Sequence, residues 1–409
     1  MNKILAIVAE YNPFHNGHLY HLQKSKQLVN PDYSICIMSG NFCERGDASI
    51  IDKWSKAEVA IKCGFDMVIE LPTLYSISSA ENFAEGSLKI LEIFDGDDVT
   101  LSFGSECGDL ITLNSISDIL YNEPEEFKTI LSHELSKGLS YPKARENALL
   151  LYLNDVRKYT NLLLGPNNIL GIEYLKALNK LNSKVKPLTI KRIDSGYNSM
   201  KIKDRLASAT AIRELLRNNK DIKKLVPTAT YNSIVENTKQ GKLINNLSVF
   251  EKEIIYTLRK MSLNEIANLQ DVSEGLENSI KQAANNCNNL EDLINSIKSK
   301  RYTRSRIQRI LLYSILDITK KDIQTSYKAK PYIRVLAVSK RGKHLLPYIS
   351  DPKSKQPVIT SVKKFMETNT NKNLKEMINK DILATNLYTL GYTKDSKSNL
   401  DYTKKLITI

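Results

Sequence analysis

The sequence lacks the features that would place it in a membrane, in a disulfide framework or among the zinc ribbons. No apolar run approaches the roughly 20 residues that span a bilayer, and the apolar segment after Met1 is too short for the core of a secretory signal. The five cysteines include no CxxC pair, so we expect reduced thiols. We therefore expect a soluble, cytoplasmic protein without a membrane partner.

The sequence also contains no internal repeat and no long low-complexity linker. Its 409 residues and 42% hydrophobic content are enough to fill the cores of two or three domains. Charge is distributed unevenly, because residues 1–150 hold 12 Lys and Arg against 22 Asp and Glu, whereas the remainder holds 47 against 23. The basic C-terminal part favours a polyanionic partner, most commonly nucleic acid. A lysine-rich surface from an AT-rich genome is the alternative.

The first hundred residues alternate short apolar runs with helical patterns. The apolar runs are typical of buried strands, and the segments between them carry apolar residues at i, i+3 and i+4 spacing, which predicts helices. This alternation indicates a parallel sheet with right-handed crossovers, whose ligands bind beyond the carboxyl ends of the strands. The predicted strands are 3–9, 33–38, 67–70 and 99–103, and the predicted helices are 19–29, 53–63 and 80–94.

Helical patterns dominate after residue 110. Residues 110–160 are predicted to form a helical insertion within a catalytic domain that spans residues 1–220. Residues 221–409 are predicted to be mainly helical and basic, with one short strand at 331–338. The expected fold class is therefore α/β: a Rossmann-like domain with a parallel sheet, followed by a mainly α-helical basic C-terminal domain.

The segment EYNPFHNGH at residues 10–18 carries the first candidate site, because it joins a predicted strand to a predicted helix. A helix that begins near Gly17 presents free N–H groups and its positive dipole end to an anion. His15 and His18 lie one turn apart, where they could donate hydrogen bonds to phosphates and to charge that develops in a transition state. They could instead be half of a metal site, with His21 as a nearby further ligand. The arrangement resembles the HIGH-type nucleotidyltransferase superfamily, which uses ATP.

A second phosphate-binding pattern lies at residues 207–213, ASATAIR. Ser208 is a natural N-cap and Arg213 follows one turn inside the helix, so a hydroxyl, backbone N–H groups and a guanidinium can converge on phosphates. Alone, the segment could be a plain capped helix. Together with the HxGH segment, it favours a nucleotide site.

Several strings, taken together, resemble the tRNA(Met) cytidine acetate ligase family. They occur in the family's order and cover most of the chain. Members of that family activate acetate with ATP as acetyl-adenylate and transfer the acetyl group to N4 of the wobble cytidine of elongator tRNA(Met). The resemblance thus implies ATP, acetate and elongator tRNA(Met), and Mg²⁺ is expected with the ATP. The strings are EYNPFHNGHLYHL (10–22), SGNF (39–42), IELP (69–72), SFGSE (102–106), PNNILG (166–171), ASATAIR (207–213) and the segments 300–309 and 330–334.

The chain departs from the family pattern within residues 41–56. Glu44 and Ala48 stand where the pattern has Gln and Pro, and Lys56 stands where many relatives have Arg, whereas Arg45 and Lys53 are retained. A cation in this segment could also lie on a solvated helix face, so its role stays open.

The resemblance assigns catalysis to His15 and His18 and ATP binding to a larger set. Gly104, after a predicted strand, permits close approach of a ligand; Asn167 can read the base or ribose; Arg192 can neutralise phosphate. Singly, these would be a turn glycine, a capping Asn and a surface Arg. The expected ATP-binding residues are Ile7, Val8, Ala9, Glu10, Tyr11, Asn12, Pro13, Phe14, Asn16, Gly17, Leu19, Tyr20, Gly104, Asn167, Arg192, Ser208 and Arg213.

The strongest signal for RNA binding is KSKRYTRSRIQR at residues 298–309. Its six cations and one tyrosine, leading into an amphipathic helix, suit contact with backbone phosphates and stacking on a base. A solvated cationic face is the alternative. The expected tRNA-binding residues, within the basic region 221–409, are Lys300, Arg301, Arg306 and Arg309.

The leading hypothesis is a ligase in which acetate attacks the α-phosphate of ATP, pyrophosphate leaves, and the cytidine amine attacks the mixed anhydride. His15, His18 and Mg²⁺ would stabilise the developing charge. One alternative is a small-molecule nucleotidyltransferase or pantothenate-synthetase-like ligase, which leaves the basic half without a task. Another is an RNA-binding protein with a vestigial nucleotide fold, which the intact His15, His18, Ser208 and Arg213 disfavour.

Overall fold

The computed structural model describes residues 1–193, 206–351 and 356–409. Its centre is an eight-stranded sheet in the order β5-β4-β1-β2-β3-β6-β7, with β8 beside β6. The first five strands are parallel, and β6 is antiparallel to β3. The strands are β1 (Lys3–Ala9), β2 (Tyr33–Ser39), β3 (Met67–Leu71), β4 (Asp98–Ser105), β5 (Lys186–Lys191), β6 (Ile333–Val338), β7 (Val358–Ile359) and β8 (Ile407–Thr408).

The sheet is buried on both faces because its side chains alternate between two cores. On β1, Ile4 and Ala6 belong to one core, and Leu5 and Ile7 belong to the other. Helices α4 (Ala80–Leu91) and α9 (Pro166–Lys180) supply the first core, and α1 (Asn16–Val29) and α2 (Lys53–Lys62) supply the second. The predicted alternation of strands and helices in the first hundred residues is therefore confirmed, together with the Rossmann-like α/β class.

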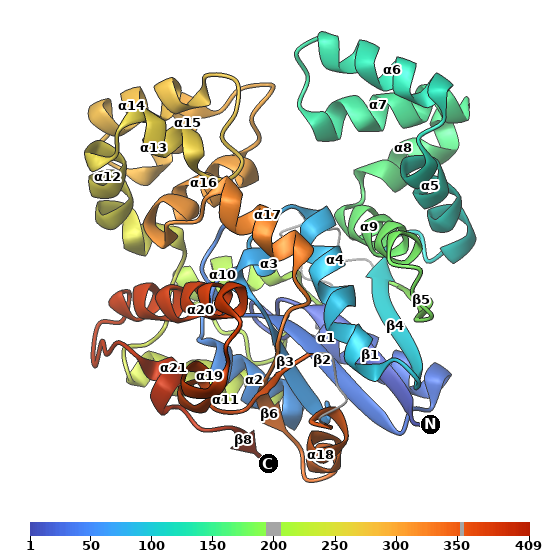
Figure 1. The fold of residues 1–409 in the computed structure, drawn as a ribbon, viewed down its shortest axis with the longest axis vertical. Coiled ribbons are helices and arrows are strands. Elements are labelled where there is room, and N and C mark those ends of the chain that lie inside the picture. Colours follow the sequence, from blue (N-terminus) through green and yellow to red (C-terminus); the bar gives the residue numbers. More distant parts are fainter. Residues whose placement is uncertain (194–205, 352–355) are drawn as a thin grey trace.

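The helical segment predicted after residue 110 lies between β4 and β5. It forms helices that stand to one side above the sheet, whereas α12 to α15 stand on the other side (Figure 1). Its helix α9 returns the chain to the sheet, where α9 packs against α4 and β4. The helices of this segment are α5 (Leu110–Asn122), α6 (Glu125–Ser136), α7 (Tyr141–Leu153), α8 (Val156–Leu164) and α9.

The C-terminal part is mainly helical, but its end returns to the N-terminal sheet. All six residues of β6 are buried, including Arg334, and the strand lies inside the sheet, where it pairs with β3. The division at residue 220 stays a prediction, yet the chain after it completes the sheet before it. The helices are α10 (Ala209–Arg217), α11 (Thr228–Lys239), α12 (Glu251–Lys260), α13 (Leu263–Asn268), α14 (Leu276–Asn286), α15 (Leu290–Ile297), α16 (Arg304–Leu316), α17 (Lys320–Lys328), α18 (Leu345–Ile349), α19 (Val362–Thr368), α20 (Lys372–Leu390) and α21 (Leu400–Thr403).

A buried charge network fastens this returning segment to the sheet. Lys53 Nζ on α2 lies 2.9 Å from Glu70 Oε1 on β3 and 2.7 Å from Asp401 Oδ1 on α21. Arg334 on β6 lies 3.0 Å from Glu70 Oε2 and also pairs with Asp401. All four side chains are at most 5% exposed. Charges this deep are stable only when each has a partner, so α2, β3, β6 and α21 hold one another in place.

None of the helices in the described ranges is long and apolar enough to cross a bilayer.

Candidate nucleotide-binding site

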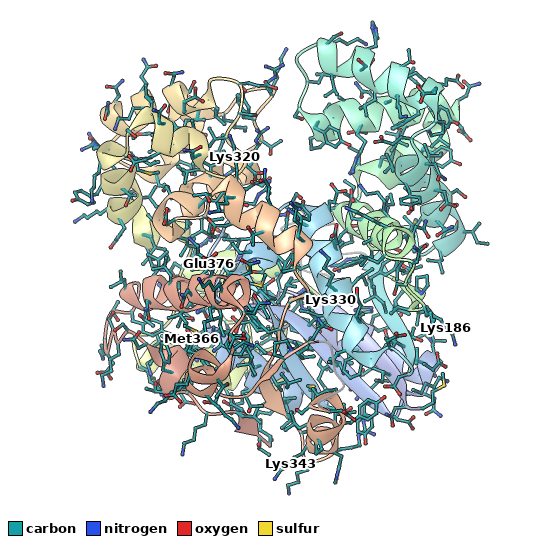
Figure 2. The ribbon with its side chains drawn as sticks, viewed as in Figure 1. Lys186, Lys320, Lys330, Lys343, Met366 and Glu376 are labelled. Atoms are coloured by element: carbon teal, nitrogen blue, oxygen red, sulfur yellow. The ribbon has the colours of Figure 1, made fainter. Side chains whose placement is uncertain are left out.

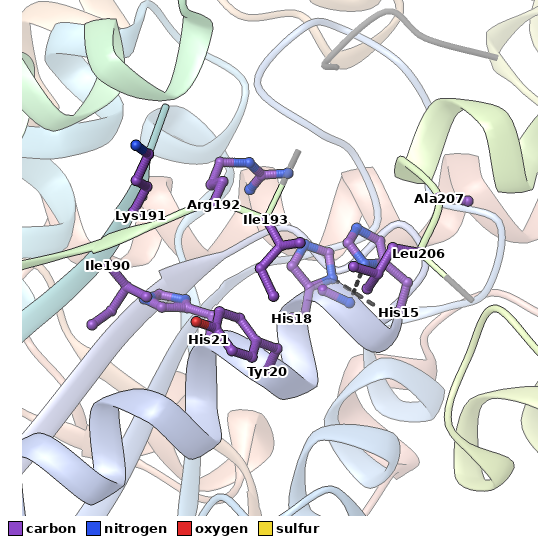
Figure 3. Close-up of a pocket in the computed structure, with 12 residues that line it drawn as sticks. His15, His18, Tyr20, His21, Ile190, Lys191, Arg192, Ile193, Leu206 and Ala207 are labelled. Atoms are coloured by element: carbon purple, nitrogen blue, oxygen red, sulfur yellow. Dashed lines mark hydrogen bonds between the residues drawn. The ribbon is translucent and has the colours of Figure 1, made fainter. Parts of the chain in front are cut away.

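A pocket lies at the carboxyl ends of β4 and β5, beside the start of α1 (Figure 3). This is the edge at which parallel sheets bind ligands. The pocket brings together six of the residues predicted to form the site: His15, Gly17, His18, Tyr20, Gly104 and Arg192. Its other lining residues are His21, Ile190, Lys191, Ile193, Leu206 and Ala207.

His15 and His18 together cap the first turn of α1. Gly17 N donates to His15 Nδ1 at 3.0 Å, and His15 N donates to His18 Nδ1 at 3.2 Å. The two rings stack with centroids 3.7 Å apart. Since both Nδ1 atoms accept hydrogen bonds, a neutral ring carries its proton on Nε2. The Nε2 atoms have no hydrogen-bond partner among the described residues, so each ring offers one N–H donor.

Both rings are neutral at pH 7. Burial, followed by the charges of Arg192 and Arg213, lowers the pKa of His15 to about 3. Burial lowers the pKa of His18 well below its usual value, and His15, Arg192 and His21 lower it further. The positive charge available to an anion therefore comes from the two arginines and the end of α1, while the histidines contribute directed hydrogen bonds.

Arg213 joins the two predicted phosphate-binding segments. Its Nη1 donates to Asn12 O at 2.9 Å, and its buried Nε has no hydrogen-bond partner in the described part of the chain. Ser208 Oγ accepts from Ala211 N at 3.1 Å, which confirms the predicted N-cap of α10. From the other side, Asn16 Nδ2 donates to Lys224 O at 2.9 Å. The HxGH loop is thus fixed against α10 and the chain that follows it.

Gly104 allows the Arg192 side chain to lie across the end of β4. A Cβ at Gly104 would lie 3.3 Å from Arg192 Cγ, closer than an easy contact. Arg192 Nη1 also lies 3.5 Å from Asn167 Oδ1. Asn167 Nδ2 donates a hydrogen bond to Glu106 Oε1 at 2.7 Å, and Asn168 N donates one to Glu106 Oε2 at 2.8 Å. Asn167 therefore positions Arg192 and the start of α9 and does not line the pocket.

Most of the predicted residues before His15 support the loop from behind. Tyr11 and Phe14 are buried in the core. The side-chain amide of Asn12 is hydrogen-bonded to the neighbouring loop. Its Nδ2 donates to Ala48 O at 3.2 Å, and its Oδ1 accepts from Ile50 N at 2.9 Å. The remaining predicted residues that do not line the pocket are Ile7, Val8, Ala9, Glu10, Pro13, Asn16, Leu19, Ser208 and Arg213.

Sequence reasoning missed half of the pocket lining. Ile190, Lys191 and Ile193 surround the end of β5, where the same signal that identified Arg192 could have found them. Leu206 and Ala207 immediately precede the predicted cap of α10. His21 was considered only as a metal ligand, although it lies on the same face of α1 as His18, one turn further along.

Two cations of the segment 41–56 face inward, so the solvated-face interpretation is wrong for Lys53 and Lys56, whereas Arg45 is exposed. Both lysines are 1% exposed. Lys56 Nζ donates to Glu10 O at 3.0 Å, Ser39 O at 3.0 Å and Gly40 O at 2.7 Å. Lys56 therefore ties the loops at the carboxyl ends of β1 and β2 together.

The predicted RNA-binding cations divide into two kinds. Lys300 and Arg301 are exposed, although Arg301 Nη1 lies 2.6 Å from Glu274 Oε2. Arg306 donates to Asp271 O through Nε and Nη2, at 2.9 and 2.7 Å. Arg309 is 9% exposed, and its Nε lies 3.0 Å from Asp271 Oδ2. Arg306 and Arg309 are thus occupied within the protein.

Groups of three or more His, Cys, Asp or Glu that could hold a metal ion do not occur among the described residues. The third candidate ligand, His21, has its Nε2 2.9 Å from Ser102 Oγ. The pocket offers N–H donors and Arg192 instead, which suit an anion.

Comparison with known proteins agrees with this geometry. A family model described as HIGH Nucleotidyl Transferase matches residues 2–403. The chain is 44% identical to the tRNA(Met) cytidine acetate ligase of Thermoanaerobacter sp. strain X514, with 99% of this chain and all of that protein covered. It is 39% identical to the Acetivibrio thermocellus protein of the same name, with 99% of each covered.

Two solved structures have the same fold over their whole length. The crystal structure of Thermotoga maritima TmcAL without ligand is 32% identical and superposes with a TM-score of 0.94, with both chains fully covered. The structure of that protein bound with alpha-thio ATP superposes with a TM-score of 0.91 at the same identity and coverage. These likenesses confirm the nucleotidyltransferase fold.

Proposed function

Because the chain belongs to the tRNA(Met) cytidine acetate ligase family of HIGH nucleotidyl transferases, we propose that it acetylates N4 of the wobble cytidine of elongator tRNA(Met). A carboxylate oxygen of acetate attacks the α-phosphorus of ATP, the bond to the β-phosphate oxygen breaks, and pyrophosphate leaves. The cytidine amine then attacks the acetyl carbon, the acyl–oxygen bond breaks, and AMP and a proton leave. A tRNA substrate would place the enzyme in the cytoplasm.

The observation that carries this proposal is the pair of neutral histidines beside two arginines. The Nε2–H groups of His15 and His18 would donate to phosphate oxygens and would strengthen as charge grows in the transition state. Arg192 and Arg213 would balance the phosphate charge from β5 and α10. The start of α1 adds backbone N–H groups at the same place.

Mg²⁺ would enter this site with the nucleotide. The pocket lining contains no carboxylate among the described residues, and Mg²⁺ is commonly held by substrate phosphates and water. Bound in that way, the ion would neutralise phosphate charge, while the histidines and arginines orient the α-phosphate.

For tRNA, we propose that the exposed cations before α16 contact the RNA backbone. Lys300 and Arg301 stay in this proposal because they lie at the surface. Arg309 leaves it, because a guanidinium that pairs with Asp271 inside the protein cannot also hold a phosphate. The proposed tRNA-binding region remains 221–409, and the proposed catalytic domain remains 1–220 with its insertion at 110–160.

The first experiment incubates the enzyme with ATP, labelled acetate and total tRNA, followed by nucleoside analysis. We expect label in N4-acetylcytidine. His18→Ala removes one donor to the transition state and should slow acetyl-adenylate formation by about 10²- to 10³-fold. The matched control is His133→Ala, an exposed histidine on α6, which should retain the wild-type rate.

Two outcomes would overturn the proposal. If AMP were transferred to a small metabolite while tRNA stayed unmodified, the protein would be a small-molecule nucleotidyltransferase. If His18→Ala formed acetyl-adenylate at the wild-type rate, the HxGH loop would not be the catalytic site.

The second experiment measures tRNA affinity across a salt series for the double variant Lys300→Ala, Arg301→Ala. Removing a cation that binds a phosphate lowers the salt slope by about one unit, so affinity and slope should both fall while acetyl-adenylate formation continues. The matched control replaces the exposed lysines Lys62 and Lys186 by Ala. Lys186 is the first residue of β5 and is labelled in Figure 2. Equal slopes for both double variants would remove the segment from the RNA site.

A further inference from the structure

One pocket residue has no part in the phosphate chemistry proposed above. His21 follows His18 by one turn of α1, so it lies further from the helix end that would bind phosphate. Figure 3 shows His21 and Ile190 at one end of the pocket and His15 with Ala207 at the other. The pocket therefore has a second end with its own chemistry.

A chain of hydrogen bonds between α1 and β4 fixes the proton position on His21. Ser25 Oγ lies 2.7 Å from His21 O, and a carbonyl can only accept, so Ser25 must be the donor. Ser25 Oγ also lies 2.7 Å from Ser102 Oγ, so Ser102 must donate its proton there. Ser102 Oγ, 2.9 Å from His21 Nε2, can then only accept. His21 is therefore protonated on Nε2.

The consequence is an unpaired acceptor. Both serines are fully buried, so this chain cannot exchange its partners for water. Burial, followed by the charge of Arg192, lowers the pKa of His21 to about 4, so the ring is neutral at pH 7. Nδ1 then carries a lone pair and has no hydrogen-bond partner among the described residues. His15 and His18 offer donors to the pocket, whereas His21 offers an acceptor.

The surroundings of His21 suit a nucleobase. Ile190 and the ring of Tyr20 provide apolar walls, and the Arg192 side chain lies across Gly104 at the end of β4. Phosphates would occupy the opposite end, where Arg213 and the start of α1 supply positive charge beside His15. A nucleotide that spans the pocket would thus bring its base to His21.

We propose that His21 Nδ1 accepts a hydrogen bond from the exocyclic amino group of adenine and so makes the pocket selective for ATP over 6-oxo purine nucleotides. The inference rests on the proposed use of ATP. A 6-oxo purine presents a carbonyl at this position, and two acceptors would face each other in a desolvated site. Leaving such groups unpaired weakens binding by about 10- to 100-fold.

The experiment measures the binding of ATP and of inosine triphosphate (ITP), which differ at this position, to the full chain without acetate or tRNA. The wild type should bind ATP at least about tenfold more tightly. His21→Ala should bring the ratio of the two affinities near one. Ser102→Ala should lower it as well, because the Nε2 proton then has no acceptor and Nδ1 becomes the better site for it.

The affinity ratio is internal to each variant, so a general loss of stability cancels. Ser87→Ala, which removes another fully buried serine hydroxyl on α4, is the matched control and should keep the wild-type ratio. Unchanged ratios in His21→Ala and Ser102→Ala would overturn the inference, even if tRNA acetylation were abolished, since His21 would then serve another group. If neither nucleotide bound the wild type, the proposed use of ATP would fall as well.

Discussion

Replacing Asp401 by Asn tests how the end of the chain is attached to the sheet. Burial alone would raise the pKa of Asp401, but Lys53 and Arg334 lower it to about 2, so the carboxylate is charged above about pH 4. The substitution removes the carboxylate that pairs with both cations and leaves them with Glu70 and the more distant charge of Asp381. Removing one partner from a buried ion network costs about 3–5 kcal/mol. We therefore expect a marked loss in the free energy of unfolding.

The assay is equilibrium unfolding in urea, followed by the fluorescence of Trp54. Trp54 is the only tryptophan of the chain and is 5% exposed. Lys53 Nζ lies 5.0 Å from the centre of its ring, so its emission reports on the network itself. If urea lowers stability by a few kcal/mol per M, the midpoint should move by about 1 M. The wild type should also lose stability as pH falls from about 4 towards 2, and the variant should lose less.

The matched control is Asp317→Asn, which removes an exposed carboxylate that lies 3.9 Å from Lys380. Exposed pairs contribute about 0–1 kcal/mol, so its midpoint should stay near that of the wild type. If Asp401→Asn moved the Trp54 transition no more than this control, the C-terminal segment would unfold independently of the sheet. The buried network would then not connect them.

Two further predictions concern packing and pH. Gly86→Ala should lower stability by about 1–3 kcal/mol, because the new Cβ would lie 2.3 Å from Cγ of the buried Tyr75; a gain in the urea midpoint, as helix propensity alone would give, would contradict the packing. His21→Gln should reduce the acid sensitivity of stability. The pKa of His21 is about 4 in the folded state and 6.5 in the unfolded state, so between these values the unfolded state binds a proton that the folded state does not. The free energy of unfolding therefore falls as pH decreases from 6.5 to 4. At pH 5 the lowered pKa of His21 reduces the free energy of unfolding by about 2 kcal/mol. If wild type and His21→Gln lost the same free energy of unfolding between pH 7 and pH 5, the prediction would be refuted.

Local pattern was sufficient for the elements that place the pocket. The run 3–9, the polar loop after it and the helix from Gly17 could be predicted because each depends on neighbours in the sequence. The edge of the sheet followed from the alternation of strands and helices. Ser208 was predicted as a cap for the same reason, since a cap needs only the residues that follow it.

What sequence could not give depends on partners far along the chain. Arg309 looked like a free cation because its partner Asp271 is 38 residues away. The strand 331–338 was predicted, but not its place beside β3, because strand pairing leaves no local trace. The acceptor on His21 depends on Ser102, which is 81 residues away. In each case the sequence identifies the residue but does not show the long-range contact that determines its role.

The HxGH spacing itself follows from helix capping as much as from catalysis. His15 occupies the N-cap of α1 and His18 the third position, and each Nδ1 accepts one of the N–H groups that a helix start leaves free. Gly17 is required between them, because a Cβ there would lie 2.9 Å from Cε1 of His15. Because both Nδ1 atoms accept capping hydrogen bonds, both rings present their Nε2–H groups away from the helix backbone. The same bonds that begin the helix therefore determine which atoms a phosphate would meet, and this explains how a short pattern can specify both the fold and the proposed chemistry.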